Sequence, residues 1–152
     1  MAVSKESIVE LRELTGAGIM DARRALEESN GDLRQAQEII RQKGLAMAAK
    51  KGDRVAKQGL VEAYVHGGRL GALIELNCET DFVARTDDFK QLAREIAMQA
   101  AANGASDAEE LRKQSYNRDT SKTIETLINE TVGRVGENIV LRRVARFELG
   151  SE

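Results

Sequence analysis

The apolar residues of this chain change their spacing once, from a helical period to a strand period. In roughly the first 43 residues they recur every three or four positions, as they do along one face of a helix. From Val61 onward they alternate with polar residues, and Gly67-Gly68 separates two such stretches. The chain is therefore expected to begin with helices and to continue into a β-hairpin.

Residues 1–43 are expected to form three short amphipathic helices. Gly16 can end the first helix in the left-handed conformation, Asn30-Gly31 separates the second from the third, and Gly44 is expected to end the third. Their apolar faces are predicted to contain Ile8, Leu11 and Leu14 in the first, Ala22, Ala25 and Leu26 in the second, and Leu33, Ala36, Ile39 and Ile40 in the third. Together they would make a small three-helix bundle.

Residues 59–152 are predicted to form an α+β core. Beyond the hairpin, helices are expected after Thr86, after the capping-box residues Ser106 and Glu109, and in the stretch before the last strand. The buried face of that strand is expected to carry Ile139, Leu141, Ala145, Phe147 and Leu149, with Arg142 and Arg146 on the exposed face. These elements predict a three-stranded antiparallel sheet with helices packed on one face, joined to the bundle by a basic, partly helical linker at 44–58.

The charge of the chain is nearly balanced, with 23 basic and 25 acidic side chains among 152 residues. No overall field therefore attracts nucleic acid or an anionic membrane. The N-terminal residues lack the apolar stretch of a secretory signal, and nowhere do about 18 apolar residues run together as a membrane span requires. With Cys78 as the only cysteine, the chain is expected to be a soluble cytoplasmic protein without disulfides.

Residue types suited to catalysis are scarce. His66 is the only histidine and lies beside the predicted hairpin turn, where a solvent-exposed residue is expected rather than a proton carrier. Cys78 is expected to be a small buried hydrophobe on the same face as Ile74 and Leu76. The sequence contains no phosphate-binding glycine loop and no multi-cysteine metal site. The chain is therefore not expected to be an enzyme or to hold a cofactor or a metal.

An aromatic ring and a carboxylate stand side by side where the second strand pattern stops. Only 3% of the residues are aromatic, and Phe82 follows Asp81 within the segment Asn77–Arg85. One interpretation is that the ring is exposed at a corner and enters a pocket of a partner. The other is that Thr80 or Asp81 caps a helical turn while Phe82 packs inward. The residue pattern is compatible with both.

Two further segments also allow more than one use. The glycines of the loop Thr15–Met20 permit a turn, or they expose Ile19 and Met20 as an adaptable apolar contact. The basic segment 43–57 has no aromatic residue, so a solvated linker is favoured over a nucleic-acid site. The alternatives are a peptide-binding adaptor and an adaptor for nucleic acid or the ribosome that uses Lys50, Lys51, Arg54 and Arg142.

Three long motifs resemble the signatures of a known family, elongation factor Ts of bacteria. They are Leu11–Ala22, Asn77–Ala84 and Gly136–Arg143, which read LRELTGAGIMDA, NCETDFVA and GENIVLRR. Their order and spacing fit the family as well, and together they span most of the chain. The resemblance implies a ubiquitin-associated-like (UBA-like) three-helix head followed by an α+β core.

The resemblance also implies a function and a set of contact residues. It implies a guanine-nucleotide exchange factor that acts on elongation factor Tu in translation, without covalent chemistry and without direct nucleic-acid or membrane binding. It assigns the displacement of magnesium from the partner's nucleotide site to Thr80, Asp81, Phe82 and Val83. It assigns docking of the head to Arg12, Ile19 and Met20, with Ile19 at a position where members of the family often have Met.

Longer members of the family carry a second core subdomain, a coiled-coil insertion and a C-terminal module, so the chain resembles a short form. A single sheet with helices on one face leaves its other face open. We expect Leu60, Tyr64 and Leu73 to lie on the open face and a homodimer to form across it.

Overall fold

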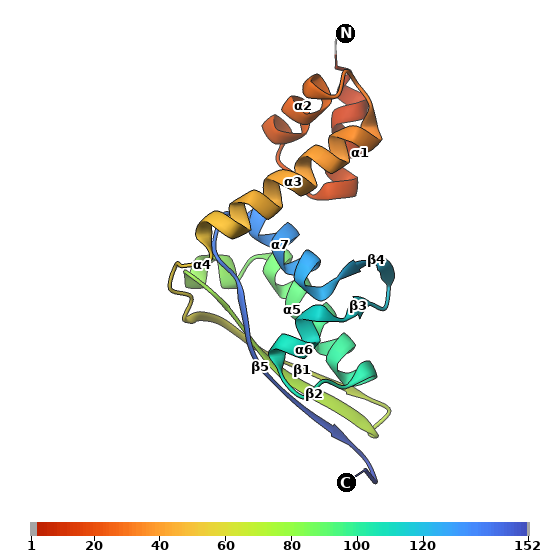
Figure 1. The fold of residues 1–152 in the computed structure, drawn as a ribbon, viewed down its shortest axis with the longest axis vertical. Coiled ribbons are helices and arrows are strands. Elements are labelled where there is room, and N and C mark those ends of the chain that lie inside the picture. The colour runs from red at the N-terminus through yellow and green to blue at the C-terminus, as the bar shows by residue number, and fades with distance from the viewer. Residues whose placement is uncertain (1–2, 152) are drawn as a thin grey trace.

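The structure, a computed structural model that describes residues 3–151, begins with a three-helix head (Figure 1). Its helices are α1 (Lys5–Thr15), α2 (Ile19–Glu28) and α3 (Leu33–Lys51). Gly16 ends α1 in the left-handed conformation, with φ of 73°, as the sequence predicts. The small core of the head consists of Leu11, Ala22, Ala25, Leu26 and Ala36.

Helix α3 does not end at Gly44, which is where the sequence pattern predicted its end. It continues to Lys51 and packs on α7 (Ile124–Val135). The two helices cross where Gly44 meets Gly133, and a Cβ built on Gly133 would lie 2.8 Å from the Cα of Gly44. Gly44 is therefore a site of close helix contact and not a stop signal. Because α3 crosses the boundary between 1–43 and 44–58, that domain division stays a prediction.

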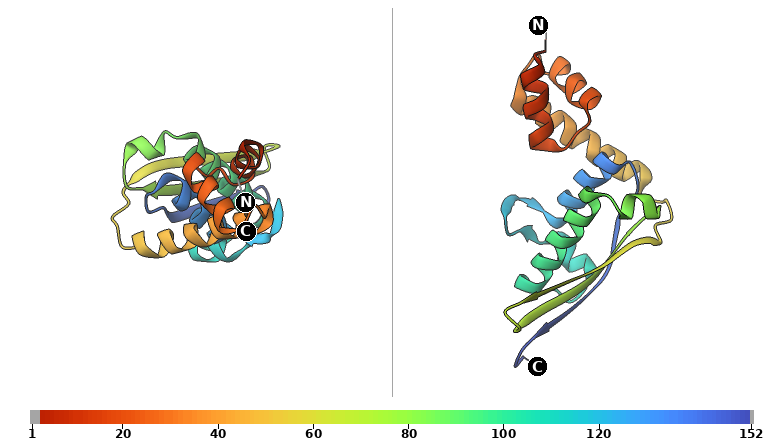
Figure 2. Two further views of the ribbon diagram at one scale, coloured as in Figure 1. Left: turned by 90° about the horizontal axis from the view of Figure 1, so that it is seen from above. Right: turned by 180° about the vertical axis from the view of Figure 1, so that it is seen from behind.

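The core is a three-stranded antiparallel sheet with helices on one face, which confirms the predicted α+β fold class. Its strands β1 (Gln58–His66), β2 (Leu70–Cys78) and β5 (Val140–Glu148) are ordered β1-β2-β5. Helix α5 (Asp87–Asn103) covers the sheet, α6 (Ala108–Lys113) contacts β5, and α7 packs on α5 and α6. Seen from behind in Figure 2, these helices lie on the same side of the sheet, and the head and the far tip of the sheet form opposite ends of an elongated molecule.

A β-bulge in β5 changes which of its side chains face the helices. Glu75 pairs with Arg143 and Leu76 with Leu141, so one extra residue interrupts the register. Leu141 is buried as expected, but beyond the bulge the buried face passes to Val144. The expected alternation was therefore wrong past this point, with Ala145, Phe147 and Leu149 exposed and Arg146 half-buried, donating from Nε to the carbonyl of Ala101 at 2.9 Å.

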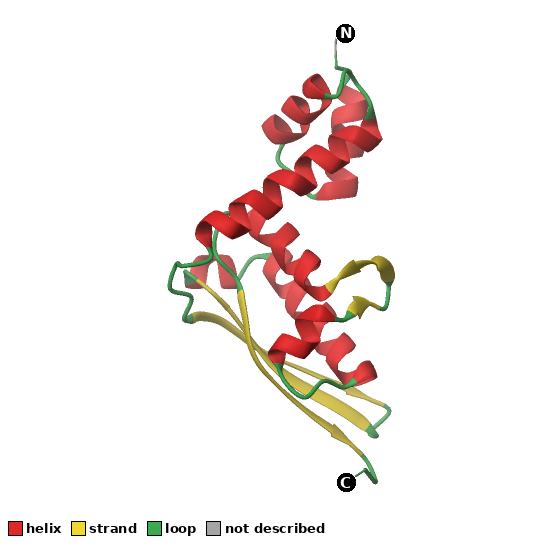
Figure 3. Cartoon of the chain, in the orientation of Figure 1, coloured by secondary structure: helices red, strands yellow, loops and turns green. Residues whose placement is uncertain are grey.

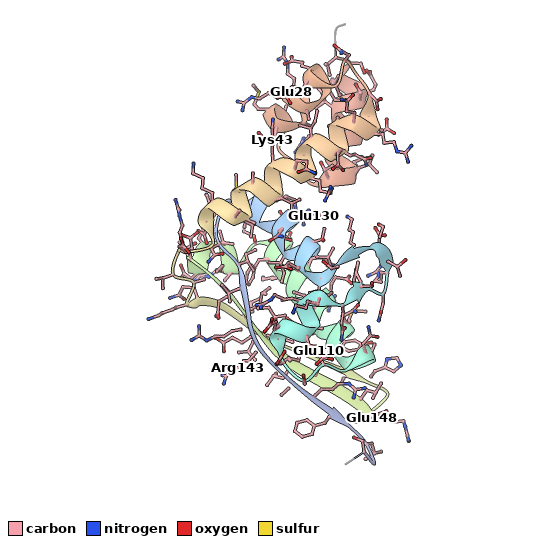
Figure 4. The ribbon with its side chains drawn as sticks, in the orientation of Figure 1. Glu28, Lys43, Glu110, Glu130, Arg143 and Glu148 are labelled. Carbon is pink, nitrogen blue, oxygen red and sulfur yellow. The ribbon has the colours of Figure 1, made fainter. Side chains whose placement is uncertain are left out.

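The open face of the sheet differs in detail from the prediction. Leu73 is exposed there, but Leu60 and Tyr64 pack against the core on the helix-covered side, so their placement on the open face was wrong. The residues that share the open face with Leu73 are Val61 and Val65 of β1 and Phe147 of β5. Figure 4 shows Arg143 on the same strand pointing away from the helices.

The segment between α5 and α7 contains a second small sheet that the sequence did not predict. Its strands are β3 (Ser115–Tyr116) and β4 (Asp119–Thr123), drawn in yellow beside the helices in Figure 3. Polar side chains of α5 hold it, because Glu95 accepts from Tyr116 Oη and pairs with Arg118 at 2.6 Å. Before it, α6 is capped by Asp107, one residue later than expected, and the Asp107 side chain accepts from the amide of Glu110. The carboxylate of Glu110 accepts in turn from the amide of Ser106 at 3.0 Å.

No helix among residues 3–151 is both long enough and apolar enough to cross a membrane.

Candidate functional site

The four residues Thr80–Val83 form a sharp corner between β2 and α5. Thr80 caps the short helix α4 (Asp81–Ala84), and its Oγ1 accepts from the amide of Val83 at 3.3 Å. Val83 and Ala84 are buried in the core, so the neighbouring positions of this single turn face outward. The ring of Phe82 is 76% exposed. Of the two interpretations, the capping is therefore right and the inward packing of Phe82 is wrong.

The corner is braced by the loop that joins α7 to β5. The carboxylate of Glu137 accepts from the amides of Glu79 and Thr80, at 3.1 and 3.0 Å, and from Thr80 Oγ1 at 2.8 Å. In the opposite direction, the carboxylate of Glu79 accepts from the amide of Asn138 at 2.7 Å. Each of the two carboxylates thus accepts from backbone amides of the other segment, which joins the second and third sequence motifs.

Residues of the predicted linker, 44–58, add further contacts to this loop. Asn138 donates from Nδ2 to the carbonyls of Gly52 and Arg54, at 3.3 and 2.8 Å. Lys51 donates to the carbonyl of Gly136, and the guanidinium of Arg54 lies 3.6 Å from the carboxylate of Glu79. Two of the cations considered for nucleic-acid binding, Lys51 and Arg54, are therefore engaged within the chain.

The exposed surface of the corner combines an apolar ring with a paired charge. Asp81 accepts from Arg85 at 3.0 Å, and both side chains are largely exposed. Such a surface pair contributes at most about 1 kcal/mol, so a partner can separate it at little cost. Phe82 lies between these two residues in sequence, and its exposed side chain adds apolar surface beside the charged pair.

Cys78 and His66, the residues considered for catalysis, lie at opposite ends of the β1–β2 hairpin. Cys78 is fully buried and donates to the carbonyl of Thr80 at 3.1 Å. Burial, together with the nearby charge of Glu137, raises the pKa of the Cys78 thiol to about 11. His66 is exposed at the end of β1, far along the strand from the corner, where its Nδ1 lies 3.1 Å from Tyr64 Oη. The structure does not bring the two together.

The predicted contact residues of the head lie at its α1–α2 loop. Ile19 and Met20 open α2 and are each more than half exposed. Arg12 is exposed on α1, but its Nε donates to the carbonyl of Ala17 at 3.3 Å and so also helps to hold the loop. Gly16 has a positive φ and so permits the turn, and the apolar residues after it are exposed, while their use as a contact stays a prediction.

Two residues of the candidate site were not predicted from the pattern. Leu14 was placed on the buried face with Leu11, but it is 55% exposed beside the loop. Its exposure depends on how the three helices pack together, which the sequence pattern does not contain. Glu137 lies in a recognised motif, yet no local pattern reveals its contacts with Thr80, since the two are 57 positions apart.

Comparisons with known proteins agree on one family. Residues 79–152 match the family model described as Elongation factor TS. Elongation factor Ts of Thermoanaerobacter sp. (strain X514) is 44% identical over 194 aligned positions, which cover 97% of this chain and 95% of that protein. Elongation factor Ts of Coprothermobacter proteolyticus is 42% identical, with 99% of this chain and 100% of that protein covered.

A plastid protein is similar to the same extent. Chloroplastic elongation factor Ts of Rhodomonas salina is 42% identical, with 97% of this chain and 89% of that protein covered. The aligned stretches are longer than the chain itself, at 194 or more positions against 152 residues, so these relatives carry residues that this chain lacks.

Proposed function

The chain belongs to the elongation factor Ts family of translation elongation factors, and we propose that it binds elongation factor Tu in its GDP-bound form and promotes replacement of GDP by GTP. The observation that supports this most strongly is the exposed ring of Phe82 on a braced corner. A ring held outward by a capped turn loses little conformational freedom when a partner buries it.

The proposed mechanism uses apolar burial to loosen a charged site in the partner. A nucleotide held with nanomolar affinity has about 12 kcal/mol of binding free energy, much of it from phosphate and magnesium contacts. Phe82 would enter between elements of the partner and gain about 2 kcal/mol of apolar burial. That gain shifts the elements that hold the magnesium ion, while Asp81 adds a negative charge nearby and Thr80 and Val83 fix the turn.

The head would supply a second, separate contact. Ile19 and Met20, with Leu14 beside them, offer exposed apolar surface, and Arg12 offers a cation at the same loop. This contact holds the partner whether or not nucleotide is bound, whereas the corner acts against the bound nucleotide. Because coupling between two ligands is reciprocal, incoming nucleotide must in turn weaken the grip of this chain and release it.

The test is direct. Fluorescent GDP is released from purified elongation factor Tu in a stopped-flow instrument, with excess unlabelled nucleotide, in the presence of increasing amounts of this chain. The proposal predicts a release rate that rises with the concentration of the chain and then saturates. A rate equal to spontaneous release at every concentration would refute it.

A second copy of the chain is proposed to cover the open face of the sheet. Val65, Leu73 and Phe147 expose apolar surface there, with Phe147 81% exposed. Glu75 and Arg143 form an ion pair at 2.9 Å on the same face. In a symmetric dimer each copy would therefore present both charges to the other, so that opposite charges can meet across the interface. This homodimer would bury on both copies a face that a lone sheet leaves in water.

A further inference from the structure

The side chain of Glu137 lies in the loop after α7 and hydrogen-bonds to Glu79 and Thr80, at the start of the corner. Its Oε1 accepts the amides of Glu79 and Thr80, and its Oε2 accepts the hydroxyl of Thr80 at 2.8 Å. We propose that Glu137 is a positioning residue for nucleotide exchange, which sets the direction of α4 and thereby aims Phe82 at the partner. This inference rests on the proposed function of the corner.

The hydroxyl of Thr80 connects Glu137 to the cap of α4. A threonine hydroxyl has one hydrogen to donate and two lone pairs to accept with. Because the carboxylate of Glu137 takes that hydrogen, a lone pair of Thr80 Oγ1 is turned toward the amide of Val83, the bond that caps α4. A helix of one turn cannot hold its own conformation, so its cap decides where Phe82 points.

The fold itself does not depend on this carboxylate in the same way. The loop and the corner are also joined by the amide of Asn138, which donates to Glu79. Val83 and Ala84 anchor the turn in the core. Thr80 is exposed, so water can hydrate the donors that lose the carboxylate, but mobile water does not fix the direction of the hydroxyl as the carboxylate does. Loss of Glu137 should therefore loosen the aim of Phe82 more than it unfolds the protein.

The variants separate positioning from general stability. Glu137→Ala removes the acceptor of the Thr80 hydroxyl hydrogen. Thr80→Val replaces only the hydroxyl, in a side chain of equal shape. Glu137→Gln keeps an oxygen for the two amides but has an NH2 in place of Oε2, which cannot accept the hydroxyl hydrogen, so it should lower the rate as Glu137→Ala does. Glu125→Ala is the matched control, because Glu125 is exposed in the first turn of α7 and the described residues give its side chain no hydrogen bond or ion pair.

The readout is stopped-flow release of fluorescent GDP from elongation factor Tu over a range of factor concentrations. Glu137→Ala and Thr80→Val are expected to lower the maximal release rate about fivefold to tenfold, the effect of losing one helix cap, with little change in the half-saturating concentration. A merely destabilised protein would instead raise the half-saturating concentration and reach the same maximum. That result, or a maximum equal to the control, would overturn the proposal.

A second measurement needs no partner. Amide hydrogen exchange of the free protein, followed by NMR, is expected to speed up at Thr80 and Val83 in Glu137→Ala and to stay unchanged in Glu125→Ala. Unchanged exchange in Glu137→Ala would contradict the positioning role even if nucleotide release were affected. If the wild-type chain failed to speed GDP release from elongation factor Tu, the proposed function would be refuted. The amide hydrogen-exchange rates would still decide whether Glu137 orders the corner.

Discussion

The thiol of Cys78 illustrates how burial decides the chemistry of a single residue. It lies under the corner, and burial raises its pKa to about 11. The thiolate is the reactive form, so a raised pKa keeps the group protonated and inert at neutral pH. Its contribution is to pack beside Ile74 and Leu76, as the alternating strand pattern indicated.

We predict that Cys78 resists alkylation by iodoacetamide in the native protein at pH 7 and reacts readily once the chain is unfolded in guanidinium chloride. The folded-state pKa lies above the unfolded value of 9.0, so the folded state favours the protonated thiol. The resulting stabilisation is complete below pH 9 and is lost as the pH rises toward 11. Mass spectrometry of the labelled protein checks this, and rapid labelling of the native chain at pH 7 would contradict it.

Residue types at the corner were easier to predict than the direction of one ring. The sequence indicated a cap at Thr80 or Asp81 and an aromatic residue in the turn, and both are present. Whether Phe82 points inward depends on which neighbours fill the core, and Val83 and Ala84 fill it. That choice is made by packing against distant elements, which a local pattern does not contain.

The helices and strands were predicted well where a local signal ends them. They were predicted poorly where a contact with a distant part of the chain decides their length or register. The hairpin turn at Gly67-Gly68 and the end of α7 at Gly136 follow from backbone conformation alone. The bulge in β5 and the passage of α3 through Gly44 follow from partners far along the chain. Gly44 is therefore a contact point between helices, although the local pattern predicted a helix end there.

The crossing of α3 and α7 gives a prediction for a pair of glycines. A Cβ on Gly133 would lie 2.8 Å from the backbone of α3, whereas a Cβ on Gly44 meets no atom closer than 3.4 Å. We expect Gly133→Ala to lower the free energy of unfolding by about 1–3 kcal/mol, as overpacking does. Gly44→Ala should be neutral or slightly stabilising, because alanine favours the helix. Urea denaturation of both variants tests this, and equal effects would argue against the close crossing.

Across the whole molecule, one side chain of α7 links the head to the start of α5. Arg134 donates from Nη1 to the carbonyl of Thr15 at 3.2 Å, and its Nε lies 3.6 Å from the carboxylate of Asp88. Gly16 stacks on the same side chain, since a Cβ there would lie 2.5 Å from Arg134 Cδ. Arg134 thus contacts both the loop that precedes Ile19 and Met20 and the helix that follows the corner.

The open sheet face leads to a prediction about the assembly. Leu73 lies at its centre, paired with Ala63 on one side and Ala145 on the other. We expect the chain to sediment as a dimer at micromolar concentration and Leu73→Glu to sediment as a monomer, because the new carboxylate would be buried without a partner. Val9→Glu, which changes an exposed apolar residue of α1, is the control. A monomeric wild-type chain would contradict the proposed homodimer.

The central claim is that a ring on a braced corner loosens the nucleotide of another protein, and one measurement tests it most directly. Stopped-flow release of fluorescent GDP from elongation factor Tu is compared at saturating wild-type chain, Phe82→Ala and Leu149→Ala, the last being another exposed apolar side chain. Losing about 2 kcal/mol of burial predicts a maximal rate about thirtyfold lower for Phe82→Ala and unchanged for Leu149→Ala. Equal rates for all three proteins would contradict the account.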